Sequence, residues 1–261
     1  MPVLSRRIVR AAAVQTQPIT RSLRKTIEQG VKLAKKAAEK EADIICLPEH
    51  WLPEEQIPTP LDPIPSFQRL AEEYGAVIAV GAFYEKVKDK IRLGCPVVGP
   101  DGRVLGRQFK VHPFGREKKI VVPGHRYEIF KAKGFKFGVL VCYDVDFPEA
   151  SRIFALRGAE LLLCPSRIIR EGAVPWHQYV TVRSLENRLP ITAPNVYAPP
   201  YFMGQSCIVS LKEDPKRKIA HPRILSLARR GVGVLVDDFD LDLHNKLRKM
   251  RFADRRPQTY N

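Results

Sequence analysis

Residues 138–149 read Gly-Val-Leu-Val-Cys-Tyr-Asp-Val-Asp-Phe-Pro-Glu, and this stretch indicates both the fold and the chemistry of the chain. The apolar run from Phe137 to Cys142 predicts a buried strand, and the segment from Pro148 to Arg157 predicts a helix. Cys142 therefore follows a strand and precedes a helix. A sharp turn at this point would lift the sulfur out of the sheet and direct nearby backbone N–H groups at a bound oxygen atom.

Strands and helices alternate on both sides of this stretch. We predict strands at 8–15, 43–47, 76–84, 160–164, 191–196, 207–211 and 232–236, and a hairpin of 93–98 with 104–109 around Pro100-Asp101-Gly102. We predict helices at 22–38, 66–74, 176–187 and 241–250, and a loop at 112–126. This alternation predicts an α/β chain with a mixed sheet covered by helices, and because no linker divides residues 1–261 we expect a single domain.

The composition fits a soluble, cytoplasmic protein. Hydrophobic residues make up 44% of the chain, yet no uncharged apolar run reaches the ~18 residues of a membrane-spanning helix, and no secretory signal is found. The formal net charge of +16 raises the alternative of nucleic-acid binding. The basic residues are, however, spread along the chain among 28 acidic ones and are not interleaved with aromatic residues. We therefore favour a solvated basic surface.

The five cysteines show neither a disulfide framework nor a zinc pattern. Their number is odd and no C-x-x-C pair occurs, so reduced thiols are expected. Four of them are predicted to be small core residues, because free cysteine is among the most buried side chains. The remaining one, Cys142, is the candidate nucleophile. The cysteines are Cys46, Cys95, Cys142, Cys164 and Cys207.

Two further segments place reactive side chains where predicted strands end. Glu49 lies in Leu-Pro-Glu-His-Trp directly after the strand at 43–47, and Lys110 follows the strand at 104–109. Glu117 comes seven residues later. Each residue alone is most simply a charge in a surface loop. Together they could activate Cys142, because a lysine stabilises nearby negative charge and a partly buried glutamate can carry the thiol proton.

A papain-like arrangement is the alternative source of a base. It would use His112 or His177 with Asn195. Neither the spacing of these residues nor any signature of the known cysteine peptidases supports it.

The three segments together resemble the nitrilase superfamily of carbon–nitrogen hydrolases. The resemblance rests on Glu49 in Leu-Pro-Glu, Lys110 in Lys-x-His-x-Phe, and Cys142 in Cys-Tyr-Asp-x-x-Phe-Pro-Glu, in this order. Residues 183–188 resemble the Arg-x-x-Glu-Asn helix of the family, and residues 6–15 resemble its first strand. The resemblance thus covers nearly the full length.

The resemblance implies roles for these residues. Glu49 would be the general base, Cys142 the nucleophile, and Lys110, with the backbone N–H of Tyr143, the stabiliser of the tetrahedral intermediate. Glu117 would position the substrate and orient the lysine. The implied fold is a four-layer α-β-β-α sandwich with two mixed sheets, paired through its helices into homodimers or larger assemblies. The implied reaction passes through a thioester acyl-enzyme and needs no metal or organic cofactor.

The implied substrate is a small amide, since Tyr143-Asp144 after the cysteine resembles the amidase branches, including ω-amidase-like members. A nitrile or an N-carbamoyl compound is the alternative substrate, and a catalytically idle oligomeric binding protein is the alternative of a different class. Arg167 and Trp176 are candidate pocket residues: Arg167 could bind a substrate carboxylate, and Trp176 could form a wall. The simpler interpretations are a solvated arginine and a packed aromatic ring.

Overall fold

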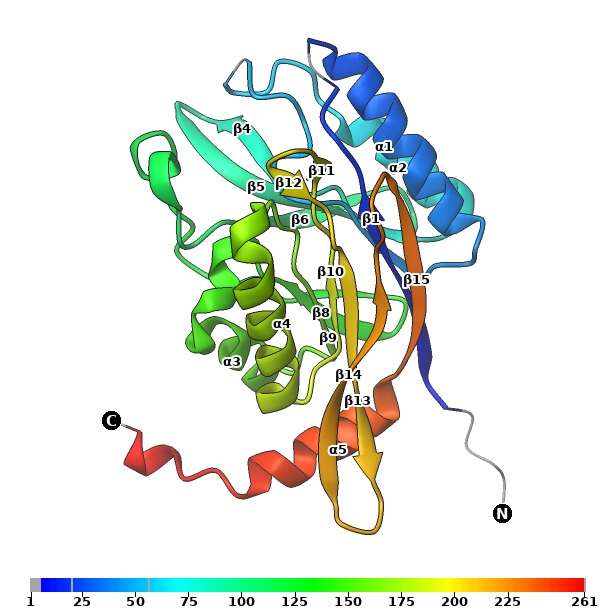
Figure 1. Cartoon of the computed structure of the whole chain (residues 1–261), viewed down its shortest axis with the longest axis vertical. Helices are drawn as coiled ribbons and strands as arrows, with labels where there is room; N and C mark the ends of the chain where they lie inside the picture. The colour runs from blue at the N-terminus through cyan, green and yellow to red at the C-terminus, as the bar shows by residue number, and fades with distance from the viewer. Residues whose placement is uncertain (1–5, 20, 56, 261) are drawn as a thin grey trace.

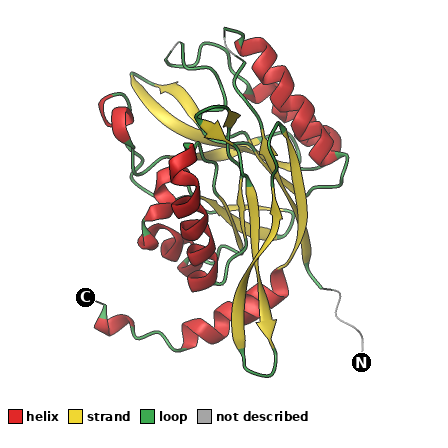
Figure 2. Cartoon of the chain, in the orientation of Figure 1, coloured by secondary structure: helices red, strands yellow, loops and turns green. Residues whose placement is uncertain are grey.

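Two mixed β-sheets lie face to face at the centre of the protein, and helices cover their outer faces (Figures 1 and 2). The computed structural model describes residues 6–19, 21–55 and 57–260. None of the helices in these ranges is both long and apolar enough to cross a lipid bilayer. The expected α-β-β-α sandwich with two mixed sheets is confirmed.

The first sheet has seven strands in the order β15-β1-β2-β3-β5-β4, with β6 also paired to β5. Strands β1, β2 and β3 are parallel, and β15 is antiparallel to β1. The carboxyl ends of β2 and β3 therefore meet at one edge of the sheet, where sites commonly form. The strands are β1 (Ile8–Gln15), β2 (Ile44–Cys46), β3 (Val77–Ala79), β4 (Phe83–Val87), β5 (Lys90–Val98), β6 (Val104–Phe109) and β15 (Gly233–Asp240).

The second sheet has six strands in the order β14-β13-β10-β9-β8-β7. Strands β8, β9 and β10 are parallel, so their carboxyl ends also share an edge. The strands are β7 (Phe130–Ala132), β8 (Phe135–Val139), β9 (Leu161–Leu163), β10 (Ile191–Ala193), β13 (Cys207–Asp214) and β14 (Ile219–Leu227). A short hairpin of β11 (Tyr197–Ala198) and β12 (Phe202–Met203) stands apart from both sheets.

Helices α1 and α2 pack on the first sheet, and α3 and α4 pack on the second (Figure 1). Ser22 caps α1 through its side chain, and Gly75 ends α2 in the left-handed region at φ 61°. The α-helices are α1 (Leu23–Ala38), α2 (Ile64–Tyr74), α3 (Pro148–Leu156), α4 (Ala173–Asn187) and α5 (Leu241–Ala253). Short 3₁₀ helices occupy Gly115–Lys119, Cys142–Asp146, Arg170–Gly172 and Pro257–Thr259.

Alternation along β1 shows how the layers are built. Ala11 and Ala13 face the core between the two sheets, whereas Ala12 and Val14 face α1. Because successive side chains of a strand point to opposite faces, a strand buried on both sides is apolar throughout. The run Ala-Ala-Ala-Val meets this requirement with side chains small enough for close packing of the layers.

The structure differs from the sequence-based prediction in several details. The strand expected at 76–84 is interrupted at Gly81, which has φ 77°; β3 and β4 both run antiparallel to β5, so the chain continues in the same direction after the interruption. The strand expected at 137–142 ends at Val139, and Cys142 instead begins a 3₁₀ helix. The loop expected at 112–126 contains another 3₁₀ helix, and β7, β11, β12 and β14 were not predicted. β14 escaped prediction because most of its residues are exposed, so it lacks an apolar pattern.

Candidate active site

Cys142 lies at a tight turn beyond the carboxyl end of β8. Its backbone has φ 50°, and its N–H donates to the carbonyl of Pro165 at 2.9 Å, just after β9. A positive φ is uncommon for a residue with a Cβ atom and concentrates at functional sites. The turn thus places the cysteine at the edge where the parallel strands β8 and β9 end.

Glu49 and Lys110 meet beyond strands of the first sheet, although 61 residues separate them. Glu49 follows β2 and forms an isolated bridge with Ala82, and Lys110 follows β6 with its N–H bonded to the carbonyl of Leu93 at 2.9 Å. Lys110 Nζ lies 2.7 Å from Glu49 Oε1. Glu49 is only 2% exposed and Lys110 only 1%. Neither residue is therefore a solvated loop charge. Both are buried charges, which proteins tolerate when the charges are paired with one another.

Glu117 completes this buried cluster from the 3₁₀ helix Gly115–Lys119. Its Oε2 lies 2.9 Å from Lys110 Nζ and accepts the backbone N–H of Phe114 at 2.7 Å, while its Oε1 bonds His50 Nε2 at 3.0 Å. Burial acts to raise the pKa of Glu117, but the hydrogen bond from His50 and the charge of Lys110 outweigh it and lower the pKa to about 2. Glu117 is therefore ionised at neutral pH.

The electrostatics keep the lysine charged and the thiol protonated. Burial alone would lower the pKa of Lys110, but the charges of Glu49 and Glu117 outweigh it and raise the pKa. Burial also raises the pKa of the Cys142 thiol well above its ordinary value, and the Glu49 charge raises it further. Lys110 and a backbone N–H from Arg167 act in the opposite direction. The cluster therefore holds a neutral thiol beside a carboxylate that can take its proton.

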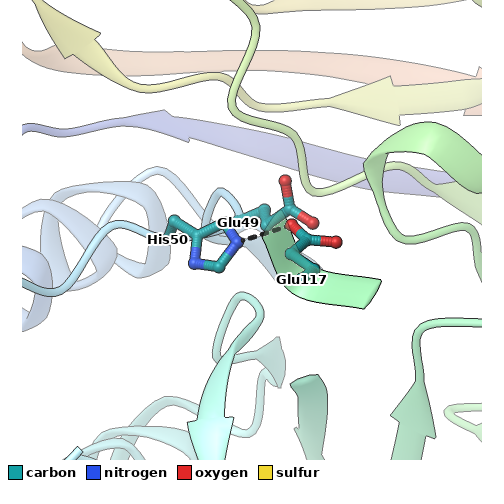
Figure 3. Close-up of side chains that lie close together, drawn as sticks. All are labelled: Glu49, His50 and Glu117. Carbon is teal, nitrogen blue, oxygen red and sulfur yellow. Dashed lines mark hydrogen bonds and ion pairs between the residues drawn. The ribbon is translucent and has the colours of Figure 1, made fainter. Parts of the chain in front are cut away.

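A metal ion could in principle be held by Glu49, His50 and Glu117, whose potential ligand atoms lie within 4.8 Å of one another (Figure 3). The donor set does not fit one well. The ammonium of Lys110 already sits 2.7 and 2.9 Å from the two carboxylates and supplies the positive charge that they require.

A cavity of about 270 Å³ opens beside the sulfur. Its walls are mostly apolar and aromatic, which is typical of a site for a small organic molecule. The lining residues include Phe114, Cys142, Tyr143, Arg167, Trp176 and Tyr179.

The three candidate substrate-binding residues all line this cavity. Tyr143 follows the nucleophile and its ring packs edge-on against Phe114, with centroids 5.0 Å apart. Trp176 is almost fully buried, and its Nε1 has no hydrogen-bond partner in the described part of the chain. Arg167 is paired through Nη1 with Glu54 at 3.0 Å, so it is not merely solvated.

The papain-like arrangement is not assembled. His112 bonds Asp144 through Nδ1 at 2.8 Å and stacks on Phe147, with ring centroids 3.7 Å apart. His177 bonds the carbonyl of Gln205 at 2.9 Å. Asn195 accepts the N–H of Ile168 at 2.8 Å. All three side chains are engaged by structural partners.

Two participants were not singled out from the sequence, namely His50 and Glu54. His50 is 3% exposed, and its Nδ1 lies 2.6 Å from Glu54 Oε1. Its position directly after Glu49 was the available signal, but a histidine beside a strand end is common. Glu54 offered no signal, because its partners Arg116 and Arg167 come from distant loops.

Comparison with known families agrees with this geometry. A family model described as carbon-nitrogen hydrolase matches residues 10–214, which is most of the chain. The chain therefore belongs to the carbon-nitrogen hydrolase family, and the expected membership of the nitrilase superfamily is confirmed.

Relatives within this family carry several names. The chain is similar to the omega-amidase NIT2 of Xenopus tropicalis, with 28% identity over 62% of this chain and 66% of that protein, slightly less than two thirds of its length. It is similar to a nitrilase of Pyrococcus abyssi, with 29% identity over 97% and 99% of the two chains. The crystal structure of a carbon-nitrogen hydrolase from Helicobacter pylori G27 matches with a TM-score of 0.81 and 25% identity over 97% of each chain.

Proposed function

We propose that this protein hydrolyses the C–N bond of small amides through a thioester on Cys142. The observation that carries the proposal is that the buried charges of Glu49 and Lys110 act on the Cys142 thiol, with Glu117 behind Lys110, at the side of a cavity of about 270 Å³. Burying three charges is costly unless they are paired, and a structural role alone does not require two of them to lie beside a sulfur atom.

The first half of the proposed reaction forms the thioester. Glu49 takes the thiol proton as the sulfur attacks the amide carbonyl carbon, and the C=O electrons move onto oxygen. The ammonium of Lys110 and the backbone N–H of Tyr143 bind the resulting oxyanion. As the oxyanion collapses, the C–N bond breaks and Glu49 returns the proton to the leaving nitrogen, which departs as ammonia or an amine.

The second half repeats these steps with water. Glu49 takes a proton from a water molecule, whose oxygen attacks the thioester carbonyl. The second tetrahedral intermediate expels the sulfur, which regains a proton from Glu49 while the carboxylic acid leaves. Glu117 bonds Lys110 and His50 throughout, so it orients the ammonium and does not itself exchange a proton.

The cavity limits the substrate to a small molecule, with Trp176 as a wall and Arg167 at the side that carries Glu54. The similarity to an omega-amidase supports an amide substrate. A small nitrile is the second candidate, supported by the similarity to a nitrilase over nearly the whole chain. An N-carbamoyl compound would use the same nucleophile.

We further propose that the protein is a homo-oligomer. Val174 and Val182, both on α4, are 68% and 46% exposed, and exposed apolar side chains favour association. Light scattering after size-exclusion chromatography tests this. The single domain and the cytoplasmic location stay predictions.

The test of the reaction is ammonia release from a panel of short amides, nitriles and N-carbamoyl compounds. Cys142→Ala should abolish release while the thermal unfolding temperature stays near that of the unmodified protein. Cys207→Ala, the same change at a buried cysteine that does not line the cavity, is the matched control and should retain turnover. Full turnover by Cys142→Ala would overturn the proposal.

A separate test addresses the alternative of a catalytically idle binding protein. If that alternative holds, the unmodified protein should hydrolyse no compound of the panel, and Cys142 should not be alkylated selectively among the five cysteines.

A further inference from the structure

His50 occupies a buried position between two carboxylates. Its backbone has φ 48°, and its N–H donates to the carbonyl of Ala82 at 2.7 Å, which fixes the turn directly after Glu49. The ring is directed at the carboxylate of Glu117, with the carboxylate of Glu49 beside it (Figure 3). The turn therefore buries two consecutive side chains, Glu49 and His50, in one cluster.

Both ring nitrogens of His50 lie close to carboxylate oxygens. Nε2 makes a hydrogen bond to Glu117 Oε1 at 3.0 Å, whereas Nδ1 lies 2.6 Å from Glu54 Oε1, at ion-pair distance but outside hydrogen-bond geometry. A neutral imidazole carries one N–H and one lone pair, and an ionised carboxylate can only accept. A neutral ring would thus place a lone pair close to a carboxylate oxygen. Only the imidazolium form avoids this repulsion and places positive charge beside both carboxylates.

The partners of His50 remain ionised. Glu117 has a pKa lowered to about 2 for the reasons given above. For Glu54, burial alone would raise the pKa, but the close contact with His50 and the nearby charges of Arg167 and Arg116 lower it to about 2. Two permanent anions therefore flank the ring.

The wider surroundings of His50 favour the same state. Burial lowers its pKa, but the charge of Glu49, the hydrogen bond to Glu117 and the close contact with Glu54 outweigh it and raise the pKa. The charged or titratable groups around the ring are Glu49, Glu54, Tyr84, Lys110, Arg116, Glu117 and Arg167.

Counting charges shows what the imidazolium contributes. Lys110 contacts both Glu49 and Glu117, so these three groups alone carry a net charge of minus one. Formation of a thiolate beside this excess negative charge would be disfavoured, because like charges at short range raise the pKa of a thiol. Adding one positive charge at His50 brings the cluster to zero.

We infer that His50 is a positioning residue. As an imidazolium it neutralises Glu117, so that the charge of Lys110 can stabilise Glu49, the thiolate and the oxyanion. It acts through Glu117 and touches no reacting atom. The inference rests on the proposed function only in taking Cys142 as the nucleophile. The alkylation and NMR tests need no amide, so failure of the two proposals can be told apart.

The first test is the pH dependence of Cys142 alkylation by iodoacetamide, followed by mass spectrometry. His50→Gln keeps a hydrogen-bond donor but removes the charge. The thiol pKa should rise by about one unit, so that alkylation below that pKa slows about tenfold. His125→Gln, at an exposed histidine outside the cluster, is the matched control and should leave the profile unchanged. Identical profiles for all three proteins would overturn the inference.

Turnover adds a readout that general destabilisation would not give. With the amide that the unmodified protein hydrolyses fastest, His50→Gln should lower kcat about tenfold or more with little change in KM, because the lost charge acts after substrate binds. A tenfold loss of kcat/KM that comes entirely from a raised KM would point to a structural role and contradict the inference.

The third test is made on the unmodified protein, so it still decides the question if the variant folds poorly. In protein labelled with ¹⁵N-histidine, NMR should show both ring nitrogens of His50 protonated at pH 7. Its signal is assigned by its loss in His50→Gln, or, if that variant is unfolded, by its coupling to the backbone. A neutral ring at pH 7 would refute the inference.

Discussion

The carboxylate of Asp144 accepts the backbone N–H of His112 at 2.8 Å and so joins the loop that carries Lys110 to the turn that carries Cys142. The same carboxylate bonds the ring of His112 at 2.8 Å and the N–H of Val141 at 3.3 Å. Asp144 has no solvent exposure. One buried side chain therefore fixes the distance between two parts of the candidate active site that follow strands of different sheets.

Removal of this carboxylate should cost stability and activity together. We expect Asp144→Ala to lower the free energy of unfolding by about 2–4 kcal/mol, because several buried N–H groups lose a charged acceptor. Turnover should fall as the lysine loop moves away from the cysteine turn. Urea denaturation and ammonia release measure the two effects. Asp89→Ala, at an exposed aspartate in the turn between β4 and β5, should change neither quantity appreciably.

Glu49→Gln should separate the acidity of the Cys142 thiol from the rate of amide hydrolysis. The negative charge of Glu49 raises the pKa of Cys142, so removing it should lower that pKa and make alkylation faster at a given pH. Amide hydrolysis should nevertheless fall by about 10² or more, because no base remains to return a proton to the leaving nitrogen. Parallel assays of alkylation and ammonia release make the comparison. Slower alkylation in this variant would contradict the assigned electrostatics.

Most of the fold followed from pattern alone. The apolar run of β1 and the helical spacing of α1 give correct boundaries to within one residue. Burial of a strand on both faces leaves an unbroken apolar run, and burial of one helix face leaves a clear period. The interruption at Gly81 was missed, because a glycine within an apolar run does not show whether the strand passes through it unbroken. The position of Cys142 at a positive φ is likewise set by tertiary contacts.

The candidate reactive residues stand in motifs that the sequence shows, but the charged residues around them do not. Glu49, Lys110 and Glu117 stand in recognisable segments, and the structure brings them together. The ion pairs around these residues could not be predicted from the sequence. Glu54 contacts Arg167 only because two loops 113 residues apart in sequence fold against one another. Pairings of that kind depend on loop geometry, which no local period encodes.

The lowered pKa of Glu117 predicts a specific acid sensitivity. A carboxyl group whose pKa is about 2 in the folded protein and 4.5 ordinarily binds protons more readily when the chain is unfolded. Its contribution to stability is therefore complete above pH ~4.5 and is lost as the pH falls toward 2. Glu117→Gln should be less stable than the unmodified protein at pH 7, and the gap should narrow as the pH drops.

Urea denaturation at a series of pH values measures this gap. Glu28→Gln, on the exposed face of α1, is the control, and its stability should run parallel to that of the unmodified protein. A Glu117→Gln gap that stays constant down to pH 2 would show that the carboxylate is not held ionised by His50 and Lys110.

Two glycines with nearly the same backbone angle offer a matched test of the Glu49 turn. Gly81 has φ 77° and Gly134 has φ 79°, so alanine at either site meets a similar strain of about 1 kcal/mol. The Cβ of Gly134→Ala would meet nothing within 4 Å, whereas that of Gly81→Ala would come 2.2 Å from the carbonyl oxygen of Pro48. That oxygen accepts the N–H of Ala82 and belongs to the residue before Glu49. Gly81→Ala must therefore displace the Glu49 backbone, and it should lose more stability than Gly134→Ala and most of the turnover. Equal losses and full activity in both variants would show that the position of Glu49 does not depend on this contact.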